Sequence, residues 1–338
     1  MVSALERSSE IDPLTRLAIR YGTDKWGAHF YTPIYHQLFL PLRGKPIRLL
    51  EIGIGAPGLR TGGGASLRMW ADYFPLGQIF GVDITPKTLS LDPRVKTFTG
   101  SQDDAAFLTR LCDEHGPFDI VIDDGSHLPR HVVASFSVLF PRLAQAGLYV
   151  IEDIQTTFWP HMQGSIGGGP TLQFAQSLMG YLNYAEMKVC HPNLQLPEVS
   201  KTIRSLRAYH NILIVEKGDN SEPSNMNYDL RNKHSERVIQ TIEEELARSP
   251  TAEAFANLAD VYRAGRDFAR AQLIIDEALA RWPDNLSLLC VAHDVALNRG
   301  DSRKVIEYLE RLMKLEPDSL ELKRMHSQAL ERFSLRGI

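Results

Sequence analysis

The stretch LLEIGIGAPG, residues 49–58, decides the fold. Its apolar start predicts a buried strand, and Gly53, Gly55 and Gly58 follow with the spacing of a dinucleotide-binding turn. In that fingerprint the third glycine lies inside the helix that begins right after the turn. Here a proline and further glycines prolong the loop to Gly64, and they would not sit inside one helix. The match to a dinucleotide site is therefore weak.

S-Adenosylmethionine (SAM) fits this turn better. SAM has no pyrophosphate, so it does not require a helix N-terminus against its phosphates. It requires a glycine turn that admits the methionine part, and an acid after the next strand for the ribose hydroxyls. Asp83 in GVDI supplies that acid, and Glu51 is the acid usual in the methyltransferase form of the turn. We expect Glu51, Gly53, Gly55 and Asp83 at a SAM site; a glycine turn without a ligand is the alternative.

Strand and helix patterns alternate on both sides of this turn, which indicates a parallel sheet with helices on both faces. We predict strands over 47–54, 78–84, 95–100, 118–124 and 148–154, and helices over 65–74, 103–115 and 130–145. Two later runs around His210 and Asn211 predict an antiparallel hairpin at the sheet edge. The fold class is α/β, a doubly wound Rossmann-like class I methyltransferase domain over 40–218, preceded by a helical or lid segment over 1–39.

The chain changes character near residue 219. A polar, turn-rich segment predicts a linker over 219–233, and 234–338 read as helices throughout. Pro283 and Pro317 each close a helical segment and lie 34 residues apart, the period of tetratricopeptide (TPR) repeats. Positions expected to be apolar in such a repeat hold Phe255, Leu258, Tyr262, Ala271 and Ala278. We predict an all-α, TPR-like domain; an irregular helical bundle is the alternative.

The bulk properties exclude several classes of protein. The chain has 338 residues and a net charge of −4, which gives no reason to expect nucleic acid as a partner. The sequence contains no run of about 18 apolar residues, so it predicts no membrane span, and the N-terminus lacks an apolar signal core. The three cysteines are far apart and form no metal-binding pattern, so we expect a cytoplasmic protein.

Acids follow two further strands. FDIVIDDGSH (118–127) places Asp123 and Asp124 after one strand, and Glu152 and Asp153 follow the last parallel strand. Ligands bind outside the carboxyl ends of strands in such a sheet, where Asp124, Glu152 and Asp153 would converge. Three carboxylates repel one another unless a hard cation joins them, which favours Mg²⁺, Ca²⁺ or Mn²⁺ over zinc. A helix cap is the alternative for a single acid, Asp123 included.

His127 lies three residues after Asp124, at the start of the next predicted helix. An exposed or capping histidine is the ordinary interpretation. Beside a cation and a bound substrate, the same imidazole would accept a proton from a hydroxyl group.

These residues resemble the macrocin O-methyltransferase family, the metal-dependent sugar O-methyltransferases of antibiotic biosynthesis. The similarity spans about 20 to 218. It includes YGTDKWGAHFYTPIYHQLF (21–39), RLLEIGIG (48–55), FDIVIDDGSH (118–127) and GLYVIEDIQTTFWP (147–160). The combination is far more specific than any one motif, and the family is often oligomeric, which implies a homo-oligomer.

The resemblance implies a role for each matching residue. Asp124, Glu152 and Asp153 match the family's Mg²⁺ ligands, and His127 matches its general base. Asp83 matches the ribose-binding acid. The adenosine side is implied to include Gln102, next to Ser101, which replaces the usual acid. Further residues implied on the cofactor or substrate side are Tyr21, Asp24, Lys25 and Asp123, for which ordinary packing or turn support is the alternative.

The function implied is SAM-dependent, Mg²⁺-dependent (or Mn²⁺-dependent) methyl transfer to a hydroxyl of a sugar or glycoside. His127 would remove the proton, and the cation would activate the hydroxyl. The segment 155–170 would form a lid over the acceptor. The TPR-like tail would bind a protein partner, mediate self-association or cover the acceptor. The alternatives are a catechol- or phenol-type O-methyltransferase, a nicotinamide oxidoreductase, and a non-catalytic TPR scaffold with a nucleotide-binding domain.

Overall fold

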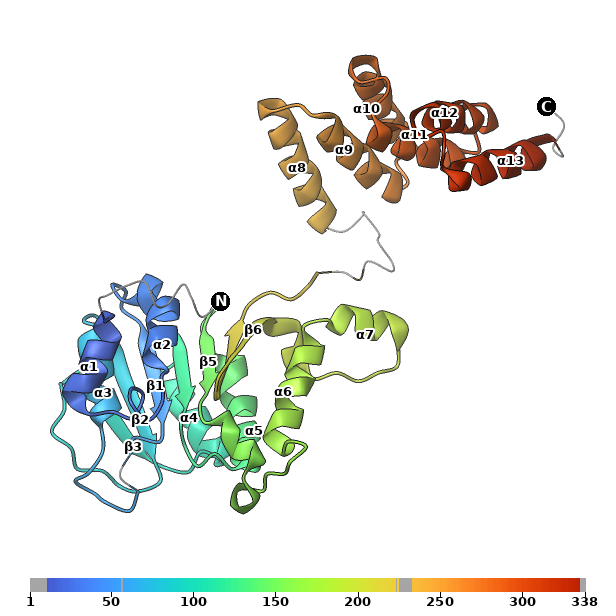
Figure 1. The fold of residues 1–338 in the computed structure, drawn as a ribbon. Helices are drawn as coiled ribbons and strands as arrows, with labels where there is room; N and C mark the ends of the chain where they lie inside the picture. Colours follow the sequence, from blue (N-terminus) through green and yellow to red (C-terminus); the bar gives the residue numbers. More distant parts are fainter. Residues whose placement is uncertain (1–10, 56, 223, 225–232, 335–338) are drawn as a thin grey trace. The chain divides into compact units, whose positions relative to one another are not determined.

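The computed structural model of the protein describes residues 11–55, 57–222, 224 and 233–334. The chain divides into two compact units, on either side of the peptide bond between Ser221 and Glu222 (Figure 1). No helix in these described ranges is long and apolar enough to cross a membrane. Most of the predicted linker over 219–233 lies outside the described residues.

A seven-stranded sheet forms the centre of the first unit, in the order β3-β2-β1-β4-β5-β7-β6. Its strands are β1 (Arg48–Ile52), β2 (Gln78–Asp83), β3 (Val95–Thr99), β4 (Ile120–Asp123), β5 (Leu148–Ile151), β6 (Ile203–Tyr209) and β7 (Ile212–Lys217). Strands β1 to β5 are parallel, and β7 is antiparallel to both β5 and β6. The predicted edge hairpin is therefore confirmed, with β7 inserted beside β5.

Helices cover both faces of the sheet, because successive strand residues point to opposite faces (Figure 1). Leu49 and Ile79 pack on one face, and Leu50 and Phe80 pack on the other. The first face is covered by α1 (Pro13–Tyr21), α2 (Thr32–Phe39) and α3 (Ala65–Tyr73). The second is covered by α4 (Ala105–His115), α5 (Pro129–Leu139) and α6 (Pro170–Tyr181). The predicted doubly wound α/β class is confirmed.

Several elements differ from their predicted limits for local reasons. The helix predicted from residue 103 begins at Ala105, because the Asp104 side chain caps it by accepting the Phe107 N–H. The helix predicted to reach residue 145 ends at Leu139, because Pro141 has no N–H to continue the α-helical hydrogen bonds, and the chain passes into a 3₁₀ turn over Phe140–Arg142. The last parallel strand ends at Ile151 rather than 154, because the backbone turns at Asp153, whose φ is 55°.

Shorter elements complete the first unit. They are the helix α7 (Tyr184–Cys190) and the 3₁₀ helices Leu40–Leu42, Phe140–Arg142, Ile154–Phe158, Pro160–Met162 and Glu198–Thr202. One of these 3₁₀ helices, Pro160–Met162, lies within the predicted lid and another, Ile154–Phe158, overlaps its start, so that segment has regular local structure; its role as a lid stays a prediction.

The second unit consists of helices in the part that the structure describes. They are α8 (Lys233–Arg248), α9 (Ala252–Ala264), α10 (Phe268–Arg281), α11 (Leu286–Arg299), α12 (Ser302–Leu315) and α13 (Leu320–Ser334). The helices α9, α11 and α13 begin 34 residues apart, as do α10 and α12. The predicted repeat positions, including Phe255, Leu258 and Ala271, are buried. The all-α class is confirmed, and the assignment to the TPR family stays a prediction.

Candidate active site

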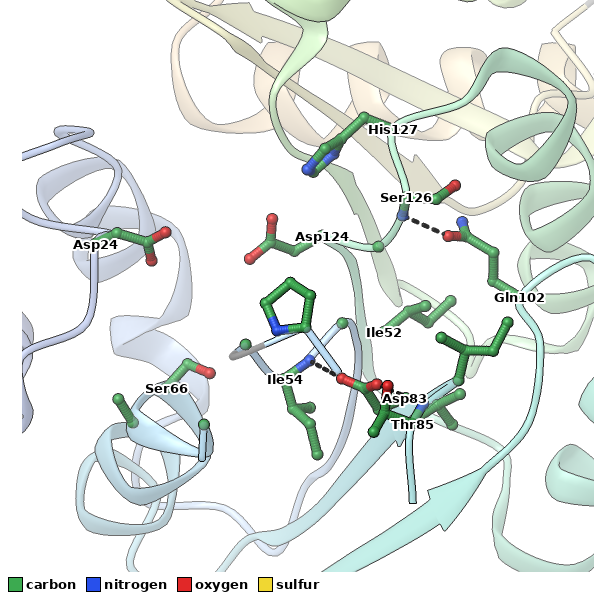
Figure 2. Close-up of a pocket in the computed structure, with 18 of the residues that line it drawn as sticks. Asp24, Ile52, Ile54, Ser66, Asp83, Thr85, Gln102, Asp124, Ser126 and His127 are labelled. Carbon is green, nitrogen blue, oxygen red and sulfur yellow. Dashed lines mark hydrogen bonds between the residues drawn. The ribbon is translucent and has the colours of Figure 1, made fainter. Parts of the chain in front are cut away.

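A cavity of about 960 Å³ opens at the carboxyl ends of the central strands (Figure 2). This is where ligands bind in open α/β sheets, and the volume suits a small molecule. The predicted site residues that line it are Tyr21, Asp24, Gly53, Gly55, Asp83, Gln102, Asp124, His127 and Asp153. Glu51, Asp123 and Glu152 do not line it; they are 0%, 2% and 4% exposed and lie behind its wall.

The glycine turn after β1 is shaped by close contact with the turn after β4. Gly53 has a φ of 81°, and its N–H donates to Val82 O at 2.8 Å. A Cβ atom at residue 53 would lie 2.0 Å from Asp124 O. Only glycine fits here, since both the left-handed backbone and the missing side chain are required. The loop continues to Gly64, and α3 begins at Ala65, as predicted.

Asp83 lies at the end of β2, with its carboxylate in the cavity wall (Figure 2). Its Oδ1 accepts the Thr85 N–H at 2.8 Å, and its Oδ2 accepts the Ile54 N–H at 3.3 Å. Lys87 lies 3.6 Å away and donates to Gly55 O at 2.7 Å. These contacts tie the glycine loop to the end of β2 and fix the direction of the carboxylate; its binding to a ribose stays a prediction.

Gln102 and Asp123 form a connected pair. Gln102 Nε2 donates to Asp123 Oδ1 at 3.0 Å, and Gln102 Oε1 accepts the Ser126 N–H at 2.7 Å (Figure 2). Asp123 also accepts hydrogen bonds from Ser135 and Tyr149. Burial raises the pKa of Asp123, and these donors oppose the rise. Asp123 thus supports Gln102 from behind, whereas Gln102 faces the cavity.

Ser101, the departure from the family pattern, is linked to a residue that the sequence did not single out. Its hydroxyl donates to Asp103, whose Oδ2 lies 3.2 Å from His131 Nε2. His131 Nδ1 lies 2.7 Å from the hydroxyl oxygen of Ser126. Ser126 and His131 both line the cavity. An acid is therefore present near Ser101, two residues later than in the family pattern.

Asp124, His127 and Asp153 form a group that fits a metal ion, with one potential ligand atom from each lying within 4.8 Å of the others. His127 Nε2 is 3.6 Å from Asp153 Oδ2. His127 and Asp153 have φ values of 57° and 55°, a left-handed backbone that costs a non-glycine residue about 1–2 kcal/mol. Figure 2 shows Asp124 and His127 directed to the same part of the cavity as Asp24.

Glu152, the third predicted ligand, lies with Lys25 instead. Lys25 Nζ donates to both Glu152 carboxylate oxygens, at 2.8 and 2.9 Å, and to Asp124 Oδ2 at 2.8 Å. It also lies 3.2 Å from Glu51 Oε1. The structure therefore brings Asp124 and Asp153 together with His127, and pairs Glu152 with a lysine. The ligand role of Glu152 stays a prediction.

The segment 21–39 closes the site from the N-terminal side. Tyr21 OH donates to Asp72 Oδ2 at 2.6 Å, which ties the end of α1 to α3. Tyr31 OH donates to Asp153 Oδ1 at 2.7 Å, and Tyr35 OH donates to Glu152 Oε1 at 2.5 Å. Lys25 is 1% exposed and does not line the cavity, contrary to a cofactor-side role.

Sequence reasoning missed Tyr31, Tyr35, Ser126 and His131 as parts of the site. The spacing of Tyr31 and Tyr35 is that of apolar positions on one helix face, and both rings are buried. Only the hydroxyl tips reach the acids. No local pattern separates such a tyrosine from an ordinary core residue.

The comparisons with known proteins point to sugar O-methyltransferases. No protein-family model matches the chain. The 8-demethyl-8-alpha-L-rhamnosyl tetracenomycin-C 2'-O-methyltransferase of Streptomyces olivaceus is 44% identical over 214 residues, which are 63% of this chain and 56% of the relative. The mycinamicin VI 2''-O-methyltransferase of Micromonospora griseorubida is 44% identical over 214 residues, 62% of this chain and 53% of the relative. The chain spans about half the length of these curated relatives.

Solved structures agree on the fold. The MycE methyltransferase of the mycinamycin biosynthetic pathway, in complex with Mg and SAH, has a TM-score of 0.61 and 41% identity to this chain. The match covers 68% of this chain and 59% of that one. A second MycE structure, with Mg, SAH and mycinamycin VI, has a TM-score of 0.60 and 40% identity. The first unit therefore has the Rossmann-like fold of a methyltransferase.

Proposed function

We propose that this chain is a SAM-dependent, Mg²⁺- or Mn²⁺-dependent O-methyltransferase that acts on a hydroxyl group of a sugar unit in a glycosylated compound. One observation carries the proposal: a single cavity combines Asp83 with Asp124, His127 and Asp153. It thus joins a ribose-binding acid to a group fit for a metal ion. Relatives at about 44% identity that methylate sugar hydroxyls support the choice of acceptor.

SAM is assigned to the side of the cavity built by the glycine turn. Asp83 would bind the ribose hydroxyls, and Gln102 would lie beside the adenosine, held there by Asp123. The turn at Gly53 and Gly55 leaves the backbone open to the methionine part, since neither residue has a side chain. Binding fixes the methyl group relative to the acceptor, which removes the entropy cost of their encounter.

The donor set near His127 fits a hard cation. Asp124 and Asp153 offer carboxylate oxygens, which suit Mg²⁺ and Mn²⁺. These two residues would hold the ion, whereas Glu152, the predicted third ligand, would first have to exchange Lys25, which donates to both of its oxygens. A bound cation supplies Lewis acidity, which lowers the proton affinity of a sugar hydroxyl.

His127 is assigned the proton-accepting role. Its Nε2 lies 3.6 Å from Asp153 Oδ2, so the carboxylate would stabilise the imidazolium that forms. The oxygen–methyl bond forms as the sulfur–methyl bond breaks, the electron pair stays on sulfur, and the hydroxyl proton passes to His127. His127 lines the cavity, with a left-handed backbone just before α5 begins at Pro129.

Binding and turnover test the proposal together. Calorimetry should detect SAM and not NAD, and labelled methyl transfer to deoxysugar glycosides should stop in chelator and return with Mg²⁺ or Mn²⁺. His127→Gln should retain SAM binding and lower kcat by about 10²- to 10⁴-fold, the usual contribution of a general base. An Asp124→Ala variant that stays fully active in chelator would contradict the metal-dependent mechanism. Preference for catechol acceptors would favour the phenol-type alternative.

The second unit has a proposed role of its own. We assign the helical unit a role in binding a protein partner or a second copy of the chain, since stacked helical repeats create extended binding surfaces. A homo-oligomer and a cytoplasmic location stay predictions.

A further inference from the structure

Four carboxylates gather at the ends of β1, β4 and β5, and we call them the acid cluster: Glu51, Asp124, Glu152 and Asp153. The side chains of Glu51 and Glu152 are 0% and 2% exposed, whereas those of Asp124 and Asp153 are 21% and 18% exposed. The acid cluster therefore has a buried half, Glu51 and Glu152, and a half that faces the cavity.

The ammonium group of Lys25 contacts both acids of the buried half. Lys25 Nζ lies 2.8 and 2.9 Å from the two Glu152 oxygens and 3.2 Å from Glu51 Oε1. Its third contact is Asp124 Oδ2, at 2.8 Å. In the described ranges, Lys25 is the only side chain that forms an ion pair with Glu51 or Glu152. Its hydrogen bonds go to Asp124 and Glu152, at the ends of β4 and β5, and Glu51 on β1 lies within ion-pair distance.

The backbone delivers Lys25 to this position. Gly22, with a φ of 68°, caps the C-terminus of α1. A hydrogen bond of 3.1 Å from the Tyr31 N–H to Lys25 O closes the loop that follows. Within the loop, the rings of Trp26 and Phe30 meet edge to face, with centroids 5.0 Å apart. Lys25 is thus held by an ordered loop, and its side chain is only 1% exposed.

The charges of Lys25 and the acids depend on one another. Burial raises the pKa of Glu152 well above its usual range, Asp124 adds to the rise, and Lys25 opposes it. Burial also raises the pKa of Glu51, and Lys25 opposes this rise as well. For Lys25, burial favours the neutral amine, but Asp124 and Glu152 outweigh it and hold its pKa well above the usual range. Without Lys25, the buried half would hold only like charges.

We propose that Lys25 is a positioning residue that acts as a built-in cation for the buried half of the acid cluster. It offsets part of the negative charge of Glu51 and Glu152 and fixes one oxygen of Asp124. The other Asp124 oxygen and Asp153 remain available to a divalent cation from the cavity, and this part rests on the proposed function. The first unit therefore folds without the divalent cation, which is needed only for the cavity half.

The substitution Lys25→Met tests this, because it keeps the length of the side chain and removes the charge. By scanning calorimetry in chelator, the variant should lose on the order of 10 °C in the melting temperature of the first unit, as expected when a buried ion pair is broken on one side. Added Mg²⁺ should raise its melting temperature much more than that of the wild type, since a cation in the cavity then has to offset all four acids.

Lys217→Met is the matched control. Lys217 is also a buried lysine, 9% exposed, but its Nζ donates to the carbonyls of Pro141 and Leu143, both at 2.7 Å. This variant should also melt at a lower temperature, yet show the same Mg²⁺-induced shift as the wild type. Equal Mg²⁺-induced shifts in the two methionine variants would overturn the proposal.

A second variant separates charge from packing. If Lys25 acts through its charge, Lys25→Met combined with Glu51→Gln should melt above Lys25→Met alone in chelator, because one unpaired acid is gone. A role in packing alone predicts additive losses, which would count against the proposal. Should Lys25→Met fail to fold in chelator, recovery by Mg²⁺ or by Glu51→Gln supports the proposal, and failure of both rescues overturns it.

The same data distinguish this inference from the proposed function. A wild-type protein that shows no shift with Mg²⁺ or Mn²⁺, and methylates equally in chelator, would contradict the metal site. The coupling between Lys25 and Glu51, measured in chelator, would still decide the role of Lys25.

Discussion

At the scale of single residues, Cys112 shows what the core of the first unit does to a titratable group. The thiol lies on α4 against the apolar side chains beneath the sheet and is 8% exposed. Burial raises its pKa to about 11, because the apolar surroundings disfavour the thiolate. The folded protein therefore binds the thiol proton more tightly than the unfolded chain does. This contribution to stability is complete below the unfolded pKa, and it is lost as the pH rises from about 9 to about 11.

Alkylation should report this directly. Near pH 8 the native protein should expose about a hundredfold less Cys112 thiolate than an ordinary thiol would, and its reaction with iodoacetamide should accelerate as the pH approaches about 11. Mass spectrometry of tryptic peptides would measure the rate. Cys190 is exposed and provides the internal control. A Cys112 rate equal to that of Cys190 at pH 8 would contradict the predicted protection.

Single residues also show where sequence reasoning reached its limit. Asp83, Gln102, Asp124 and His127 were predicted and line one cavity, because each follows a strand whose end the sequence locates. The partner of Glu152 was not predicted, since Lys25 lies 127 residues earlier in a loop with no pattern of its own. Burial and partner identity depend on packing, which the linear sequence does not specify.

At the scale of elements, the glycine loop between β1 and α3 permits a direct test. Gly53 and Gly58 both have a positive φ, 81° and 73°. An added Cβ at Gly53 would lie 2.0 Å from Asp124 O, whereas one at Gly58 would meet nothing within 4 Å. The two positions share the backbone strain and differ in the steric contact.

Gly53→Ala should therefore lower the free energy of unfolding by about 3 kcal/mol or more, since left-handed strain and a backbone clash add together. Gly58→Ala should lower it by about 1–2 kcal/mol, from the strain alone. Urea unfolding monitored by circular dichroism measures both values. Gly53→Ala should also weaken SAM binding, because the turn after β4 has to move. Equal losses in the two variants would show that the contact with Asp124 is unimportant.

The elements themselves were largely predictable. Continuous apolar runs such as that ending at Ile52 have no solvent face, and this indicates a central parallel strand. The ends were less predictable, as the early stop of β5 at Ile151 shows. There the backbone at Asp153 turns left-handed, and its carboxylate contacts Tyr31 and His127, which are distant in the sequence.

At the scale of the whole molecule, the question is what the second unit contributes. Among the residues that the structure describes, all those lining the cavity lie between Tyr21 and Asp153. A chain that ends at Ser221, the boundary of the first unit, should therefore keep its kcat/KM for methyl transfer within about twofold, a change too small to indicate a lost contact of even 1 kcal/mol. Turnover of a labelled methyl group measures this.

Light scattering on the full and shortened chains gives the complementary result. Loss of self-association, or of a copurifying protein, with unchanged turnover supports a role of the helical unit in assembly. A shortened chain that melts normally but loses kcat/KM would instead indicate that the helices cover the acceptor.

Because the described cavity wall is confined to residues 21–153, the C-terminal part of the chain can change in evolution independently of it. Genes that join a different C-terminal domain after the β6–β7 hairpin would leave the residues that line the cavity unchanged. On the proposed function, such fusions would change the assembly or location of the protein and keep its methyl transfer.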